Sequence, residues 1–182
     1  MPSHLGTLPI LLVLAAVLAV AGCGGGAEES ASEQWAGDVC SELSTWVTEV
    51  EEAVTSLSED ALSLDQEAVR AATDDVREAT DELVDGLADL DRPETEAGEQ
   101  ASSELDELGA QLTQQLEEVE QAAETGSLSL VAVTGALAAA ASSVRSTFES
   151  LQTLDSGEEL RDGFESAGSC DSFREQVDTV GD

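Results

Sequence analysis

Residues 34–57 read QWAGDVCSELSTWVTEVEEAVTSL, and their apolar side chains recur at alternating intervals of three and four residues. This spacing places one apolar stripe along an amphipathic α-helix. The stripe comprises Trp35, Val39, Leu43, Trp46, Val50, Val54 and Leu57. Trp35 and Trp46 are eleven residues apart, close to three whole turns, so we expect both rings on one face as core anchors. Ligand stacking by the two rings is the alternative interpretation.

Three more helices with the same periodicity are expected further along the chain. The second begins with Ser63 as N-cap, because Ser63 and Gln66 form a capping box. It ends before Pro93, since the residue preceding a proline is disfavoured in helical conformation. The third is expected at residues 94–124, and the fourth at residues 128–154.

A short final segment carries apolar side chains as far as Val177. The predicted fold class is therefore all-α: an up-down-up-down four-helix bundle with short loops and a short C-terminal helical segment.

The fourth predicted helix differs from the others in charge. Residues 126–144 contain no charged side chain, although 25% of the whole chain is charged. We expect this fourth helix to be the most buried one, with only a narrow face of small polar side chains exposed to solvent. The alternative is that residues 128–144 insert into a membrane or dock a partner.

The N-terminal residues indicate a targeting segment. Residues 10–21 form a twelve-residue apolar run, shorter than the roughly 20 residues of a membrane-spanning helix and typical of a secretory signal. Val20, Ala21 and Gly22, followed by Cys23, resemble the lipobox of bacterial lipoproteins, although residues 1–9 contain no Lys or Arg. The resemblance implies cleavage before Cys23 and its modification with diacylglycerol. An uncleaved apolar N-terminus with a chance cysteine is the alternative.

Three segments are expected on this basis. Residues 1–22 are the lipoprotein signal peptide, residues 23–33 are the lipidated cysteine and a flexible acidic tether, and residues 34–182 are the helical bundle domain. The expected location is the extracytoplasmic face of the cell membrane, where acyl chains such as palmitate on Cys23 provide the anchor.

The other two cysteines form an even pair in this oxidising location. Four antiparallel helices return the chain to the end of the bundle where it began, so Cys170 should come close to Cys40. A disulfide between Cys40 and Cys170 is therefore expected, with two free thiols as the alternative.

The charge of the chain limits its partners. Forty acidic and six basic residues give a net charge of −34, and all the basic residues are Arg. Nucleic acid and anionic headgroups are therefore excluded as direct partners of the folded surface. Cationic partners and weak, nonspecific divalent cations are compatible with it. The carboxylates lie off the apolar stripes, so solvated faces are expected rather than a metal site.

The residue types that are absent exclude most catalytic chemistry. The one histidine, His4, lies in the signal segment, and the chain has no lysine. A Ser-His-Asp triad, a His-based metal site and a Schiff base are thereby excluded from the mature protein. We expect no enzyme activity, no catalytic residue and no cofactor.

One layout resembles a known group. Trp35, Cys40, Leu43 and Trp46 directly after a lipobox, with a second cysteine near the C-terminus, resemble small helical-bundle lipoproteins of actinobacteria, which have no assigned activity. The expected function is a non-enzymatic envelope interaction or structural module, with an envelope protein as a candidate partner. The alternative is a small-molecule or cation-binding lipoprotein with a pocket near Trp35 and Trp46.

Overall fold

A computed structural model describes residues 30–59, 66–124, 130–154 and 157–180. The described residues form six helices and no strand: α1 (Ala31–Glu59), α2 (Gln66–Asp89), α3 (Glu96–Glu124), α4 (Leu130–Gln152), α5 (Glu158–Ser166) and α6 (Gly168–Val180). The predicted lipobox at residues 20–23 and the predicted N-cap Ser63 lie outside the described residues.

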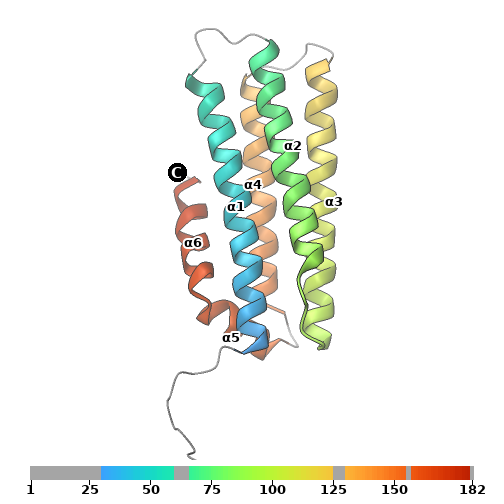
Figure 1. The fold of residues 1–182 in the computed structure, drawn as a ribbon, viewed down its shortest axis with the longest axis vertical. Helices are drawn as coiled ribbons and strands as arrows, with labels where there is room; N and C mark the ends of the chain where they lie inside the picture. The colour runs from blue at the N-terminus through green and yellow to red at the C-terminus, as the bar shows by residue number, and fades with distance from the viewer. Residues whose placement is uncertain (1–29, 60–65, 125–129, 155–156, 181–182) are drawn as a thin grey trace, which may run out of the picture.

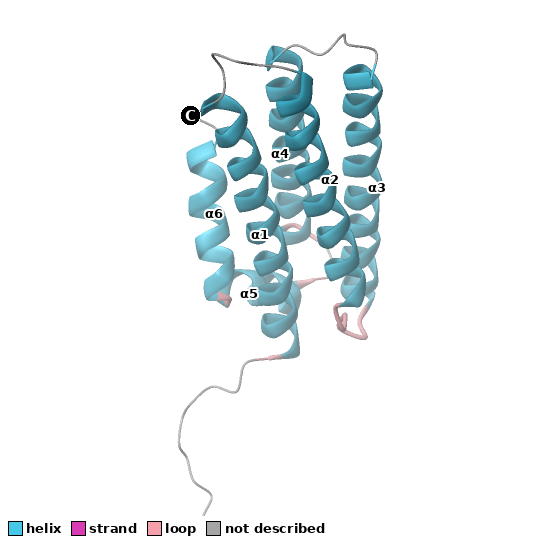
Figure 2. Cartoon of the chain, turned by 45° about the horizontal axis from the view of Figure 1, so that its top comes forward, coloured by secondary structure: helices cyan, strands magenta, loops and turns pink. Residues whose placement is uncertain are grey.

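The long helices lie side by side, and successive helices run in opposite directions (Figure 1). Helix α1 packs against α2, α2 against α3, and α3 against α4, whereas α1 and α4 touch far less. Helix α5 lies at the end of the bundle where α1 begins, and α6 turns back alongside α1 (Figures 1 and 2). The expected all-helical bundle is confirmed.

The C-terminal segment forms two helices where one short segment was expected. Ala167 separates them, because its extended backbone (φ −69°, ψ 118°) ends α5 and redirects the chain into α6. Helix α6 therefore turns back and packs along α1.

Hydroxyl side chains cap α1 and α3 at their first turns. The Ser30 hydroxyl accepts a hydrogen bond from the Glu33 amide at 3.0 Å, and the Thr95 hydroxyl accepts one from the Gly98 amide at 3.0 Å. Helix α1 thus begins three residues before the expected boundary of the bundle at Gln34. Residues 31–33, which were expected in the tether, form the first turn of α1, and Ser32 is buried.

Aromatic side chains gather in the core where α5 and α6 meet α1 and α4. Phe164 makes edge-to-face contacts with Trp35 at 5.9 Å and with Phe148 at 5.8 Å between ring centroids. Phe173 contacts Phe148 at 4.9 Å. Trp35 and Trp46 are both buried, so their predicted role as core anchors is confirmed.

The prediction that the charge-free helix is the most buried one is wrong. In α4, Gly135, Ala138, Ala139 and Ser142 are exposed. Helix α1 has more buried positions, because α2, α5 and α6 all pack on it. The exposed side chains in the charge-free part of α4 are small, so little apolar area is left uncovered there. None of the helices in the described ranges is long and apolar enough to span a membrane.

Candidate functional site

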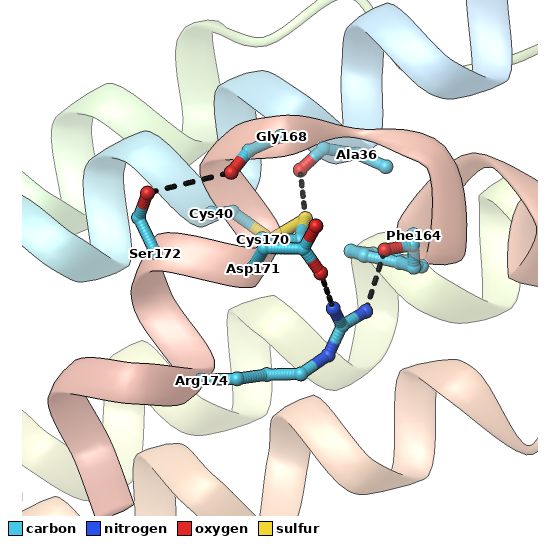
Figure 3. Close-up of polar contacts among 8 residues, drawn as sticks. All are labelled: Ala36, Cys40, Phe164, Gly168, Cys170, Asp171, Ser172 and Arg174. Atoms are coloured by element: carbon cyan, nitrogen blue, oxygen red, sulfur yellow. Dashed lines mark hydrogen bonds and ion pairs between the residues drawn. A yellow bond between two sulfur atoms is a disulfide. The ribbon is translucent and has the colours of Figure 1, made fainter.

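A disulfide joins the first turns of α6 to α1, as predicted. Cys40 and Cys170 are bonded, with their Cα atoms 5.0 Å apart (Figure 3). The sulfur of Cys170 also lies 3.3 Å from the carbonyl oxygen of Ala36. Next to it, the Ser169 hydroxyl donates a hydrogen bond to the Gly37 carbonyl at 2.8 Å. Helix α6 thus approaches α1 closely over two small residues, Ala36 and Gly37.

Arg174 fixes the position of α6 relative to α5 and α4. Its guanidinium donates to the Phe164 carbonyl at 2.7 Å and pairs with the Asp171 carboxylate (Figure 3). It also lies 5.7 Å from the centroid of the Phe148 ring, within range of a cation–π contact.

The last described turns of α6 are held from both sides. The Gln176 amide donates to the Thr48 hydroxyl of α1 at 2.8 Å. From α4, the Arg145 guanidinium donates to the Val177 carbonyl. A cation at the carbonyl end of a helix is favourable because it opposes the partial negative charge there. Helix α6 is therefore clamped between α1 and α4.

Beyond this clamp, α1 and α4 enclose an open groove of about 810 Å³, which we call the α1–α4 groove. Its floor is formed by Trp46, Val47 and Val50 of α1, which are buried. The α4 wall presents small or apolar side chains, of which Ala138 is exposed. Val177 of α6 lines one end of the groove. This groove is the candidate functional site.

Carboxylates flank the groove on both sides. Glu51 of α1 and Glu149 of α4 are exposed and belong to its lining. Arg145 is the one basic residue in that lining, and it is engaged by Val177. The groove therefore combines an apolar floor with acidic edges.

Trp46 forms part of the groove floor, and a hydrogen bond to α2 holds its ring on the side away from the groove. Its indole N–H donates to the buried hydroxyl of Thr80 on α2 at 3.2 Å. On the other side, Trp46 also lines a narrow cavity of about 30 Å³ between α1, α2, α3 and α4. That volume is about enough for a single water molecule. Trp35 lines neither space and packs against Phe164, so the structure does not bring the two tryptophans to one pocket.

An acidic cleft of about 320 Å³ lies between α1 and α2. Its carboxylates come from Glu49, Glu52, Asp75, Glu78 and Glu82. Burial raises the pKa of the Glu49 carboxyl above its ordinary value, and repulsion from neighbouring carboxylates, Glu82 first, raises it further. Within the described ranges, no three His, Cys, Asp or Glu side chains form a group suited to a metal ion.

The carboxylates of helices α2 and α3 lie outside the core, on the faces that the sequence analysis predicted to be solvated. No described Asp or Glu side chain is buried. The interior therefore offers no acid pair among the described residues. What the sequence did not predict is the groove with its clamp, which involves Arg145, Gln176 and Thr48. The only sequence signal for it is the charge-free stretch that supplies Ala138, Ala141 and Ser142.

No protein-family model, no curated protein and no solved structure matches this chain. Its function is therefore inferred from the chemistry of the site.

Proposed function

We propose that this chain is a non-enzymatic interaction module, anchored through lipid on Cys23 at the extracytoplasmic face of the cell membrane. The observation that carries the interaction role is the α1–α4 groove, a space of about 810 Å³ with an apolar floor, on a protein of net charge −34. An open apolar groove with polar edges is typical of a binding site.

The position of the anchor suits this role. Helix α1 begins at the disulfide end of the bundle (Figure 1). Eight residue steps separate Cys23 from Ala31, which corresponds to at most about 28 Å of extended chain. The disulfide end would then face the membrane, and the part of the groove beyond α6 would face away from it, toward partners in the envelope.

The anchor is tested by metabolic labelling of cells that express the chain, with an alkyne analogue of palmitate. We expect label and membrane association in the wild type and the loss of both in Cys23→Ala. Gly25→Ala serves as the matched control because it changes a residue outside the lipobox, leaves the disulfide between Cys40 and Cys170 intact and should keep the label. A labelled Cys23→Ala variant would contradict the proposal.

The interaction role is tested by a photo-crosslinking amino acid placed at single exposed sites in intact cells. Suitable sites are Ala138 in the groove, Asp81 on α2 and Glu107 on α3. A module that binds a partner should give a discrete protein adduct from at least one face. No adduct from any of these sites would overturn the interaction role.

The alternative of a small-molecule site has less support. The cavity behind Trp46 has space for about one water, far below the roughly 300 Å³ at which ligand pockets begin. The α1–α4 groove, which Trp46 also lines, is large enough for a ligand at about 810 Å³ but is open along its length. Weak divalent-cation binding at the acidic cleft fits the charge of Glu49 and its neighbours. A saturable change in tryptophan fluorescence with one metabolite or ion would favour this alternative.

A further inference from the structure

We infer that the α1–α4 groove binds a short amphipathic helix of a partner protein, with apolar side chains on one face and basic side chains at its edges. This inference rests on the proposed interaction function and specifies the partner's chemistry. It follows from three observations: the continuity of the groove with α6, the small residues of its wall, and its charge.

Helix α6 already occupies the neighbouring part of the same surface. Its Phe173 contacts Phe148 of α4, its Val177 lines the groove between α1 and α4, and both side chains are buried. The spacing of Cys170, Phe173 and Val177 is the spacing of one helical face. Val177, in the last turns of α6, lines one end of the groove, and α6 itself continues to Val180. A second helix on the axis of α6 would meet the same pair of helices and continue an interface that the protein already uses.

The dimensions of the groove suit a helix of about two turns. From Arg145, which holds the end of α6, to Leu137 there are eight residue steps on α4, or about 12 Å at 1.5 Å per residue. The wall along this length is made of small side chains, Ala138, Ala141 and Ser142. Small residues let a second backbone approach closely, as Ala36 and Gly37 do for α6.

The charge of the groove favours a basic occupant. Glu51 lies on the α1 side of the groove, and Glu149 lies on α4 about one turn past Arg145, toward the disulfide end. Arg145 keeps its positive charge while it donates to the Val177 carbonyl, so the lining carries one net negative charge in a chain of net charge −34. A Lys or Arg side chain at the edge of a bound helix would meet Glu51. A second copy of this chain would bring another 34 negative charges to the contact, and a fatty acid or anionic lipid would face the same repulsion. Recognition of an amphipathic helix in an apolar groove is a recurring binding mode.

The test uses a fluorescein-labelled peptide of about 15 residues with Leu at helical positions i, i+3, i+4 and i+7 and Lys beside them. Binding to the purified protein is measured by fluorescence anisotropy. A second peptide carries Glu in place of every Lys, and a third has the Leu and Lys residues scrambled. We expect saturable binding of the basic amphipathic peptide and binding at least about tenfold weaker for the other two.

Two pairs of adjacent residues provide matched variants. Ala138 and Ala139 are both exposed on α4, but only Ala138 lines the groove. Ala138→Arg should weaken binding about tenfold or more, and Ala139→Arg, with the same added charge, less than about twofold. Glu51 and Glu52 are both exposed on α1, and only Glu51 lines the groove. Glu51→Gln should weaken binding by about two- to fivefold, with little effect of Glu52→Gln.

Three results would overturn the inference. The first is no saturable binding of the basic peptide at millimolar concentration, or equal binding of the acidic peptide. The second is a fatty acid that displaces the peptide and is itself blocked by Ala138→Arg, which would make the groove a lipid site. The third is dimerisation, seen by sedimentation, that Ala138→Arg abolishes. None of these results removes the interaction role itself, which fails only if crosslinking finds no adduct from any face.

Discussion

The indole N–H of Trp46 on α1 donates a hydrogen bond to the hydroxyl of Thr80 on α2 at 3.2 Å, and both side chains are buried. Thr80 in turn donates to the Val76 carbonyl of its own helix at 2.8 Å. This chain of hydrogen bonds satisfies the one polar atom of the Trp46 ring inside the core. It also fixes the ring that forms the floor of the α1–α4 groove.

Replacing Thr80 with Val should destabilise the protein by about 1–3 kcal/mol, since the Trp46 N–H would stay buried without an acceptor. Thr73→Val is the matched control. Thr73 is buried on the same helix and donates only to the Val69 carbonyl, so its loss should change stability by less than about 0.5 kcal/mol. Urea unfolding followed by circular dichroism measures both. Equal losses of unfolding free energy in the two variants would show that the indole hydrogen bond adds no measurable stability.

Removing the disulfide should have the largest single effect on stability. The bond between Cys40 and Cys170 closes a loop with a sequence separation of 130 residues. The chain-entropy model assigns a loop of this size about 4–5 kcal/mol. We expect Cys40→Ala/Cys170→Ala to lose about that free energy of unfolding and to become insensitive to reductant, while the wild type with reductant approaches the double variant. A loss below about 1 kcal/mol would contradict the entropic account.

The helices and the disulfide could be predicted from the sequence because both depend on patterns that local chemistry controls. Apolar spacing located four long helices, and an even cysteine pair predicted the bond between Cys40 and Cys170. The start of α3 at Glu96 was missed because Thr95 caps it, a choice between neighbouring polar residues that periodicity does not decide.

The groove could not be predicted in the same way. It lies between α1 and α4 next to Val177, where Arg145 and Gln176 hold α6 against these two helices. Both contacts join residues more than thirty positions apart in the chain. Helical periodicity describes which face of one helix is apolar, but not how far a second helix will extend over it. For the same reason, the absence of charge in residues 126–144 did not reveal how much of α4 the other helices would leave uncovered.

Gly163 is required where α5 passes the start of α1. A Cβ atom at this position would lie 2.7 Å from the carbonyl oxygen of Ser32, which is backbone and cannot move aside easily. Gly163→Ala should therefore destabilise by about 1–3 kcal/mol through overpacking. At Gly168 a Cβ would meet nothing within 4 Å, so Gly168→Ala should be neutral or stabilising by up to about 1 kcal/mol. Thermal unfolding of the two variants tests this contrast, and a Gly163→Ala variant as stable as wild type would contradict it.

Glu49 should make stability depend on pH. Its folded-state pKa is raised, by burial first and then by repulsion from Glu82 and other carboxylates. The native protein therefore binds more protons than the unfolded chain between the ordinary glutamate pKa and the raised one, so the contribution of Glu49 to stability falls as pH rises through that interval. Glu49→Gln removes this penalty, and we expect the variant to be more stable than wild type at pH 7 but to lose that advantage in acid.

The control for this effect is Glu107→Gln, which removes one exposed carboxylate from α3, outside the acidic cleft. Any gain that it shows measures the general relief of repulsion in a chain of net charge −34. Molar salt shortens the screening length to about 3 Å and suppresses that general term. Because burial is the first cause of the Glu49 shift, the gain from Glu49→Gln should persist in molar salt while that from Glu107→Gln disappears. Unfolding midpoints over a pH series at low and high salt provide the measurement, and equal salt sensitivity of the two variants would refute burial as the main cause.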